Sequence, residues 1–275
     1  MKKTTAFIST LMFGSLLAGI ALPAAAEVTT AKKDSYGIIE FKKDKNPNPE
    51  KPDPEEPGKP GEKPGPNEPE GPGTENDGAL KVLFASNFDF RQQKITADSQ
   101  TIFASLTPWS IDDKPSKPTP NFVQVEDLRP GKESTGWALS VKQSKGFTTY
   151  KDGAKPTDEN AEQLDELTGL KMSLHGVEVF GKQAEGKLAK VTGEDITISK
   201  ESAEVMTAET GSGIGRSSAV FAKDKKDVPN GEFENPEAEA TKGDAGVKLE
   251  IPQGTNAYEA KYYATIEWAL TNGPE

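Results

Sequence analysis

The residues that could carry out chemistry in this 275-residue sequence are few in kind, because it has one histidine and no cysteine. Zinc-hydrolase chemistry and a Ser-His-Asp triad would both depend on His175. This histidine follows the alternating residues Leu170, Met172 and Leu174, and no G-x-S-x-G or H-E-x-x-H motif surrounds it. We therefore interpret His175 as a surface or hydrogen-bonded strand residue. We predict no catalytic residues and no enzymatic activity.

Carboxylates are abundant, with 44 Asp and Glu residues. A glycosidase-type carboxylate pair therefore stays open as an alternative. Two acidic segments, residues 112–113 and the loop 224–232, offer the oxygen ligands that calcium prefers, but neither has EF-hand spacing. The glycine-rich run 211–215 lacks the lysine of a phosphate-binding loop and indicates a flexible turn. We expect no metal site and no cofactor.

The charge of the chain excludes one large class of partner. The formal net charge is −11 and the isoelectric point is about 4.9. The resulting field repels phosphate backbones and anionic lipid, so we expect no nucleic-acid partner. The lack of cysteine excludes disulfides, so an exported form must depend on its hydrophobic core for stability.

The first 26 residues have the parts of a secretory signal peptide. Lys2 and Lys3 form a basic start, residues 6–22 are mainly apolar, and the sequence PAAA at 23–26 ends in an A-x-A cleavage pattern. Glycine and hydroxyl residues interrupt the apolar stretch, which favours a cleaved signal over a membrane span. We predict cleavage after Ala26, secretion to the cell surface, and no membrane span in the mature chain.

Two segments of different composition follow the signal. Residues 27–45 form a polar lead-in whose one apolar run, YGIIEF at 36–41, is either an early strand or a docking segment. Residues 46–76 form a linker in which Pro, Gly and Glu predominate. Because proline fixes φ and removes the amide donor, neither helix nor sheet propagates there. We predict a disordered spacer, and recognition of its proline motifs by a partner is the alternative.

From residue 79 onward, apolar residues recur at every second position, the pattern of half-buried strands. Residues 158–167 carry a weak signal for a short helix capped by Thr157 or Asp158. Many short strands separated by Gly, Pro, Asn and Asp turns predict one all-β module over residues 79–275, an antiparallel sandwich or barrel-like fold. The longest run places seven apolar residues on one face: Tyr258, Ala260, Tyr262, Ala264, Ile266, Trp268 and Leu270.

Two segments of the module share a Trp-x-Leu pattern, GWALSV at 136–141 and EWALT at 267–271. With them occur ALKVLFASNFDF at 79–90 and NFVQVED at 121–127. In these residues the chain resembles the WxL-domain cell-surface proteins of Gram-positive bacteria over residues 79–275. It departs from them at Arg91, where the family pattern has glycine, and in the long acidic insertion 224–239.

The resemblance, and not composition or periodicity, implies a location and partners. It implies attachment to the cell wall without a covalent bond, with peptidoglycan or another wall glycan as the ligand. It also implies complexes with other exported surface proteins.

The motif residues Trp137, Leu139, Trp268 and Leu270 have two interpretations. They either fill the core or form a stacking platform for sugar rings. We favour the core, because Val141 and other apolar residues continue the same strand faces. The better candidates for ligand contact are then aromatic residues in loops.

Three loop aromatics are the predicted ligand-binding residues. Trp109 comes first, because it lies beside a proline in a polar loop. Phe88 and Phe90 come next, because they flank Asp89 in a predicted turn.

The sequence thus predicts a surface protein that binds peptidoglycan non-covalently and takes part in an exported adhesion complex. Two alternatives remain: a protein-binding scaffold held at the wall by a partner, and a secreted carbohydrate-active enzyme with a carboxylate pair.

Overall fold

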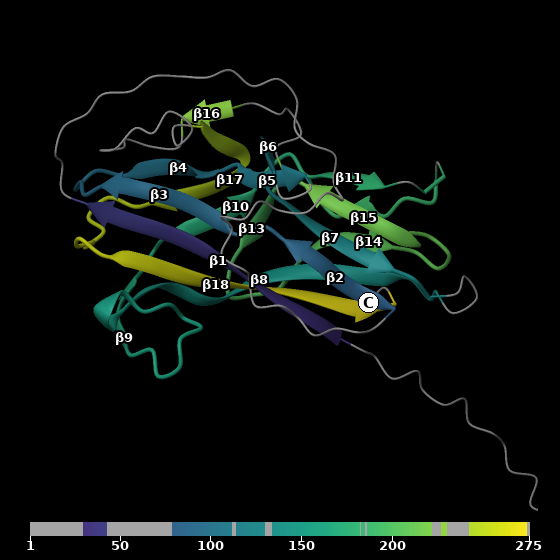
Figure 1. Cartoon of the computed structure of the whole chain (residues 1–275), viewed down its shortest axis with the longest axis horizontal. Helices are drawn as coiled ribbons and strands as arrows, with labels where there is room; N and C mark the ends of the chain where they lie inside the picture. Colours follow the sequence, from purple (N-terminus) through teal and green to yellow (C-terminus); the bar gives the residue numbers. More distant parts are fainter. Residues whose placement is uncertain are drawn as a thin grey trace, which may run out of the picture.

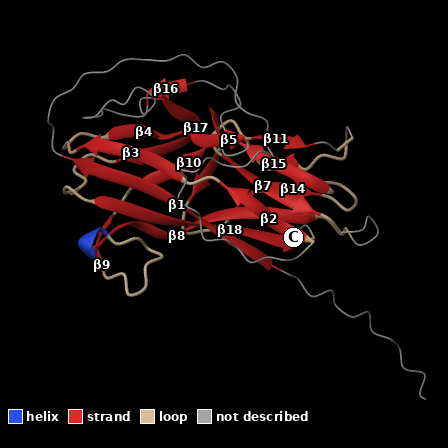
Figure 2. Cartoon of the chain, in the orientation of Figure 1, coloured by secondary structure: helices blue, strands red, loops and turns tan. Residues whose placement is uncertain are grey.

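The computed structural model shows an all-β protein whose curled sheets enclose a shared core (Figure 1). The one helical element among the described residues is a short 3₁₀ turn, η1 (Lys151–Gly153), seen in Figure 2. No helix in this part of the chain has the length and apolar character needed to cross a membrane. The predicted signal peptide (1–26) and linker (46–76) lie outside the described residues, which are 30–42, 79–111, 114–129, 134–181, 183–184, 186–221, 227–229 and 242–273.

The largest sheet contains both Trp-x-Leu motifs, on the neighbouring strands β8 and β18. Besides the six strands in the order below, it contains β9 (Gln163–Leu167), which also pairs with β8. The order across the sheet is β12 (Lys190–Val191), β14 (Ala203–Ala208), β8 (Trp137–Tyr150), β18 (Lys261–Asn272), β1 (Thr30–Lys42) and β3 (Phe88–Lys94).

Three smaller sheets complete the fold. One has the order β13 (Ile196–Ile198), β10 (Lys171–Leu174), β17 (Lys242–Ile251) and β16 (Asp227–Pro229), with β4 (Gln100–Ser105) paired to β17. Another has the order β11 (Glu178–Gly181), β15 (Gly215–Val220), β7 (Phe122–Asp127) and β2 (Leu80–Ala85). The last is the hairpin β5 (Thr107–Ile111) and β6 (Lys114–Thr119).

The predicted boundary of the module at residue 79 is wrong. Residues 30–42 are not a separate lead-in but strand β1, which lies between β18 and β3 and pairs with both. Ser35 and Ile39 point inward and are fully buried. The apolar run 36–41 is therefore part of an internal strand, so the 46–76 segment connects two strands of one module rather than preceding it.

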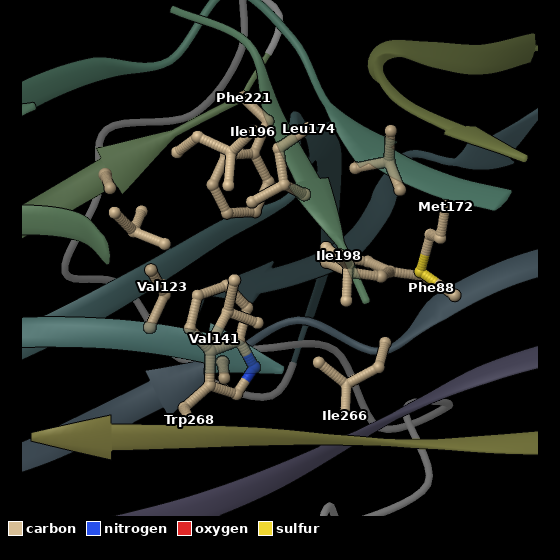
Figure 3. Close-up of a cluster of buried hydrophobic side chains, with 14 of the residues drawn as sticks. Phe88, Val123, Val141, Met172, Leu174, Ile196, Ile198, Phe221, Ile266 and Trp268 are labelled. Atoms are coloured by element: carbon tan, nitrogen blue, oxygen red, sulfur yellow. The ribbon is translucent and has the colours of Figure 1, made fainter. Parts of the chain in front are cut away.

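Alternation along the strands places apolar side chains in the core, as the sequence predicted. Strand β18 is the clearest case, although it begins at Lys261 and leaves Tyr258 outside it. Residues from three sheets meet in this core, as Figure 3 shows: Phe88, Val123, Val141, Met172, Leu174, Ile196, Ile198, Phe221, Ile266 and Trp268.

The predicted helix over residues 158–167 is also wrong. Gln163–Leu167 forms strand β9, and turns precede it. Strand β9 pairs with β8 from Tyr150–Gln163 to Phe147–Leu167. Sheet pairing and the burial of Leu167 thus outweigh the weak local helix signal.

Candidate functional site

The two Trp-x-Leu motifs lie directly beside each other on β8 and β18. Leu139 is opposite Leu270, and Trp268 is opposite Val141. Trp137 is opposite Asn272, in the last pair of the two strands. All five apolar side chains are buried, which confirms the core interpretation of the motifs.

Trp268 is held by contacts on two sides. Its ring stacks on Phe221, with centroids 6.2 Å apart and planes within 6°. Its indole Nε1–H donates a hydrogen bond of 2.8 Å to Ser35 Oγ on β1. The second motif therefore depends on a strand from the other end of the chain.

Trp137 packs beneath the turn that contains Gly213. A Cβ at Gly213 would lie 2.9 Å from Trp137 Nε1 and 2.6 Å from Ala208 Cβ, and this glycine has φ of +66°. Within the described structure, the buried Nε1–H of Trp137 has no hydrogen-bond partner. Its environment thus differs from that of Trp268, although the motifs are alike in sequence.

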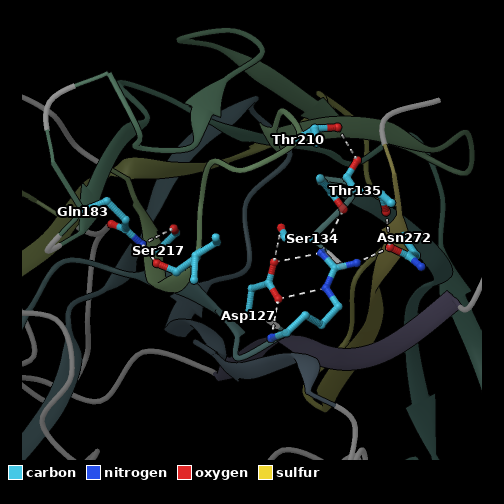
Figure 4. A network of polar contacts seen from close by, with 10 residues as sticks. Asp127, Ser134, Thr135, Gln183, Thr210, Ser217 and Asn272 are labelled. Atoms are coloured by element: carbon cyan, nitrogen blue, oxygen red, sulfur yellow. Dashed lines mark hydrogen bonds and ion pairs between the residues drawn. The ribbon is translucent and has the colours of Figure 1, made fainter. Parts of the chain in front are cut away.

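A polar network closes the end of the module next to the first motif (Figure 4). The buried carboxylate of Asp127 accepts hydrogen bonds from Arg129 Nε at 2.9 Å and Nη2 at 2.8 Å. Arg129 also donates to the carbonyl of Gly136 at 2.9 Å and to the side chain of Asn272. This arginine therefore joins the end of β7 to the ends of β8 and β18.

His175 directly follows β10 and lies beside Ser173. Its Nε2 is 2.8 Å from Ser173 Oγ, and its Nδ1 is 2.7 Å from Asp195 Oδ1. The order is that of a serine-hydrolase triad, but the side chain of Asp195 is 72% exposed. A triad needs a buried acid to orient the imidazole. The contacts thus match a hydrogen-bonded surface histidine, although His175 lies one residue beyond the strand in which the sequence placed it.

An exposed aromatic residue with a fixed orientation lies just before β18. Tyr258 is 42% exposed, and its hydroxyl donates a hydrogen bond of 2.9 Å to Asp165 Oδ2 on β9. Its ring meets Tyr262 edge-on, with centroids 5.8 Å apart. Partial burial and the Asp165 contact raise the pKa of Tyr258. Leu164, on the same strand as Asp165, is also exposed.

Comparison with known protein families identifies the module. The model of the "WxL domain surface cell wall-binding" family matches residues 28–274. The chain belongs to this family. The match begins just before β1, in agreement with the pairing of that strand inside the WxL domain. No curated protein and no solved structure matches the chain significantly.

Two of the predicted ligand-binding residues lie in the interior of the WxL domain. Phe88 and Phe90 are on strand β3, not in a surface turn, and both are fully buried. Phe88 meets Phe221 edge-on, and Phe90 meets Phe147 in the same way. Neither ring is therefore presented to a ligand in this structure.

The turn signal at these residues has a local cause. Arg91 has φ of +57°, and its backbone N–H donates to Asp89 Oδ1 at 2.8 Å. Glycine adopts this left-handed conformation most easily, in agreement with the glycine expected there from the family pattern. The turn is thus an irregularity inside β3 and does not end the strand.

Trp109 lies on strand β5 of the WxL domain, not in a loop, and pairs with Ser116 of β6. Its side chain is outside the described structure, so its role in ligand contact stays a prediction. Of the acidic segments considered for calcium, residues 112–113 and all of the loop 224–232 except 227–229 also lie outside the described residues.

Tyr258 was not predicted as an exposed loop residue, because the alternating pattern assigned it to the last strand. A cluster of turn-forming residues, PQGTN at 252–256, precedes it and was the available signal for a loop.

Proposed function

We propose that this WxL domain binds a cell-wall glycan directly, with peptidoglycan as the ligand, and that it does so without catalysis. The family match supports the coarser statement that the protein is a surface protein that binds the cell wall. Secretion through cleavage after Ala26 and attachment without a covalent bond are parts of the same proposal.

The observation that carries the proposal is the exposed, oriented ring of Tyr258 next to Asp165. A sugar ring presents apolar C–H groups on its face and hydroxyls around its edge. A binding site for it therefore combines an apolar surface with a few placed polar groups. The ring of Tyr258 provides the apolar surface, and Asp165 provides carboxylate oxygens that accept hydrogen bonds from hydroxyls.

The burial of the motif residues supports this location indirectly. Trp137 and Trp268 have no exposed surface, so they cannot stack on a glycan without opening the core. Ligand contact is therefore expected from aromatic residues outside the motifs. Tyr258 is the first candidate and Trp109 is the second. In this proposal the family motif builds the fold and other residues meet the wall.

Sedimentation with purified peptidoglycan tests the proposal. We expect Tyr258→Ala to leave the melting temperature nearly unchanged and to reduce the bound fraction several-fold. Phe180→Ala is the matched control, because Phe180 is an exposed aromatic residue on another sheet. Trp109→Ala measures the contribution of the second candidate. Failure of the wild-type protein to sediment with the wall polymer would contradict direct binding.

A specific observation favours one other function, docking to a partner surface protein. Leu128 is 60% exposed and Ile214 is 37% exposed, and they follow and precede the paired residues Asp127 and Gly215. Two exposed apolar residues at one end of a sheet suit a protein contact. A wild-type protein that ignores purified wall but forms a complex with another exported protein, lost in Leu128→Ser, would favour this scaffold role.

A further inference from the structure

Strand β1 occupies a central position that the rest of the chain leaves open for it. It pairs antiparallel with β18 from Thr30–Thr271 to Glu40–Lys261. On its other side it pairs in parallel with β3. Without β1, both neighbours would present unpaired backbone edges, which bind any compatible strand.

The position between β18 and β3 suits the particular side chains of β1. Ser35 accepts the hydrogen bond of the buried Trp268 indole, and Ile39 is fully buried. At Gly37 a Cβ would lie 2.9 Å from Met172 Cε, so a larger residue meets the opposite sheet. A strand that lacks this order of residues would leave a polar group unpaired or clash with the core.

The connection after β1 is longer than one molecule requires. β1 ends at Lys42 beside Lys94. β2 begins at Leu80 beside Asp127, in another sheet, and Asp127 is linked through Arg129 to Asn272, near the start of β1. The chain must return along β1, roughly 40 Å at about 3.3 Å per residue. Residues 43–78, if extended, reach up to roughly 110 Å at about 3.1 Å per residue.

We propose that β1 is exchanged between two copies of this chain, each copy inserting its residues 30–42 between β18 and β3 of the other. The exchanged dimer keeps every contact of the single copy, so only the entropy of connection separates the two states. A connection of this length corresponds to an effective concentration on the order of millimolar. Folding at high protein concentration therefore favours exchange, whereas folding in dilute solution favours the single copy.

The route of exchange sets its timescale. β1 lies inside a sheet, so it leaves only when pairing on both of its sides is lost. Exchange is therefore decided when the chain folds, and the product persists after folding. This inference concerns self-association and does not depend on glycan binding.

Disulfide trapping tests the exchange. Because the chain has no cysteine of its own, any disulfide that forms joins the introduced cysteines. Lys32 and Ala269 are directly opposite each other on β1 and β18, within the range that a disulfide bridges. The experiment uses the chain from residue 27 onward, which contains every described residue. The double variant Lys32→Cys/Ala269→Cys first establishes that the pair closes within one chain.

Chains with Lys32→Cys alone and chains with Ala269→Cys alone, distinguished by a size tag, are then refolded together at increasing concentration. We expect a disulfide-linked heterodimer whose yield rises with concentration and exceeds the control several-fold. The control pairs Lys32→Cys with Thr101→Cys, an exposed position on β4 that does not pair with β1. Yields equal to the control at every concentration, with the double variant closing normally, would overturn the proposal. Peptidoglycan sedimentation, measured separately, leaves this result unaffected.

Discussion

The indole of Trp268 donates its hydrogen bond to Ser35, a residue 233 positions away in the sequence. The bond joins the second Trp-x-Leu motif to the first strand of the module. Both residues are fully buried, so neither can exchange this partner for water. The family motif is thus completed by a segment with no motif of its own.

Replacing the second motif tryptophan should destabilise the fold rather than remove a ligand contact. We expect Trp268→Ala to lower the free energy of unfolding by about 3–5 kcal/mol, because a cavity opens beside Phe221. Urea denaturation measures the loss, and wall sedimentation below the midpoint shows whether folded protein still binds. A fully stable Trp268→Ala protein that no longer binds would show that the indole is part of the binding site.

The hydrogen bond itself can be isolated with a double-mutant cycle. Ser35→Ala should cost about 1–3 kcal/mol, because it leaves the indole N–H of Trp268 buried without an acceptor. In the Trp268→Phe background the donor is absent, so the same serine substitution should be nearly neutral. An equal cost of Ser35→Ala in both backgrounds would argue that packing, not the hydrogen bond, accounts for the effect.

The turn over the first motif offers a matched pair of glycine substitutions. Gly213 and Gly211 have φ of +66° and +71°, but a Cβ at Gly211 has no neighbour within 4 Å. Gly211→Ala should therefore cost only backbone strain, about 1–2 kcal/mol. Gly213→Ala should cost clearly more, because its methyl group meets Trp137 and Ala208. Thermal and urea denaturation of the two variants make the comparison, and equal losses would exclude the close packing described for Trp137.

Local alternation was sufficient to predict the strands and the burial of the motifs. Trp137, Leu139, Trp268 and Leu270 each lie on a strand with period-two apolar residues, and burial follows that period directly. The residues around Phe88 were harder, because the turn signal at Asp89 and Arg91 is real but lies within a strand.

The position of β1 could not be predicted, because its pairing is entirely non-local. A proline-rich segment separates it from β3, and its other neighbour is the last strand of the chain. A proline-rich composition is typical of a linker between domains. Here the strands before and after the segment belong to one module. The exposure of Tyr258 was missed for a related reason, because periodicity alone does not show where pairing begins.

A carboxylate pair on the outer face of β1 and β18 should give opposite pH responses. Asp34 is directly opposite Glu267. Burial and the nearby Glu267 raise the pKa of Asp34. Hydrogen bonding to Lys32, with Lys142 also nearby, lowers the pKa of Glu267.

The signs of these shifts separate two isosteric variants. The raised pKa of Asp34 means that its favourable protonated form is present below the unfolded pKa of about 3.9 and is lost as pH rises. Asp34→Asn should therefore raise the melting temperature at pH 7, and the gain should disappear below pH 4. Glu267 contributes above its unfolded pKa of about 4.3, so Glu267→Gln should lower the melting temperature at pH 7. Melting curves from pH 3 to pH 8 test both, and a loss of stability in Asp34→Asn at pH 7 would contradict the assignment.

Cutting the chain within residues 46–76 should not release the segment that precedes the cut. A recognition site for a specific protease, inserted there, allows cleavage of the folded protein. Because β1 pairs with β18 and β3 and buries Ile39, we expect the fragment containing β1 to co-elute with the rest on size exclusion. It should separate only in denaturant.

Two neighbouring isoleucines provide the control for this cleavage experiment. Ile39 points into the core, whereas Ile38 lies on the outward face and is only half-buried. Ile39→Asp would place a carboxylate in the core, where burying an unpaired charge costs several kcal/mol, so the cut fragment should dissociate. Ile38→Asp keeps its carboxylate at the surface, so the fragment should stay bound. Release of the wild-type fragment without denaturant would mean that residues 27–45 are a separable lead-in after all.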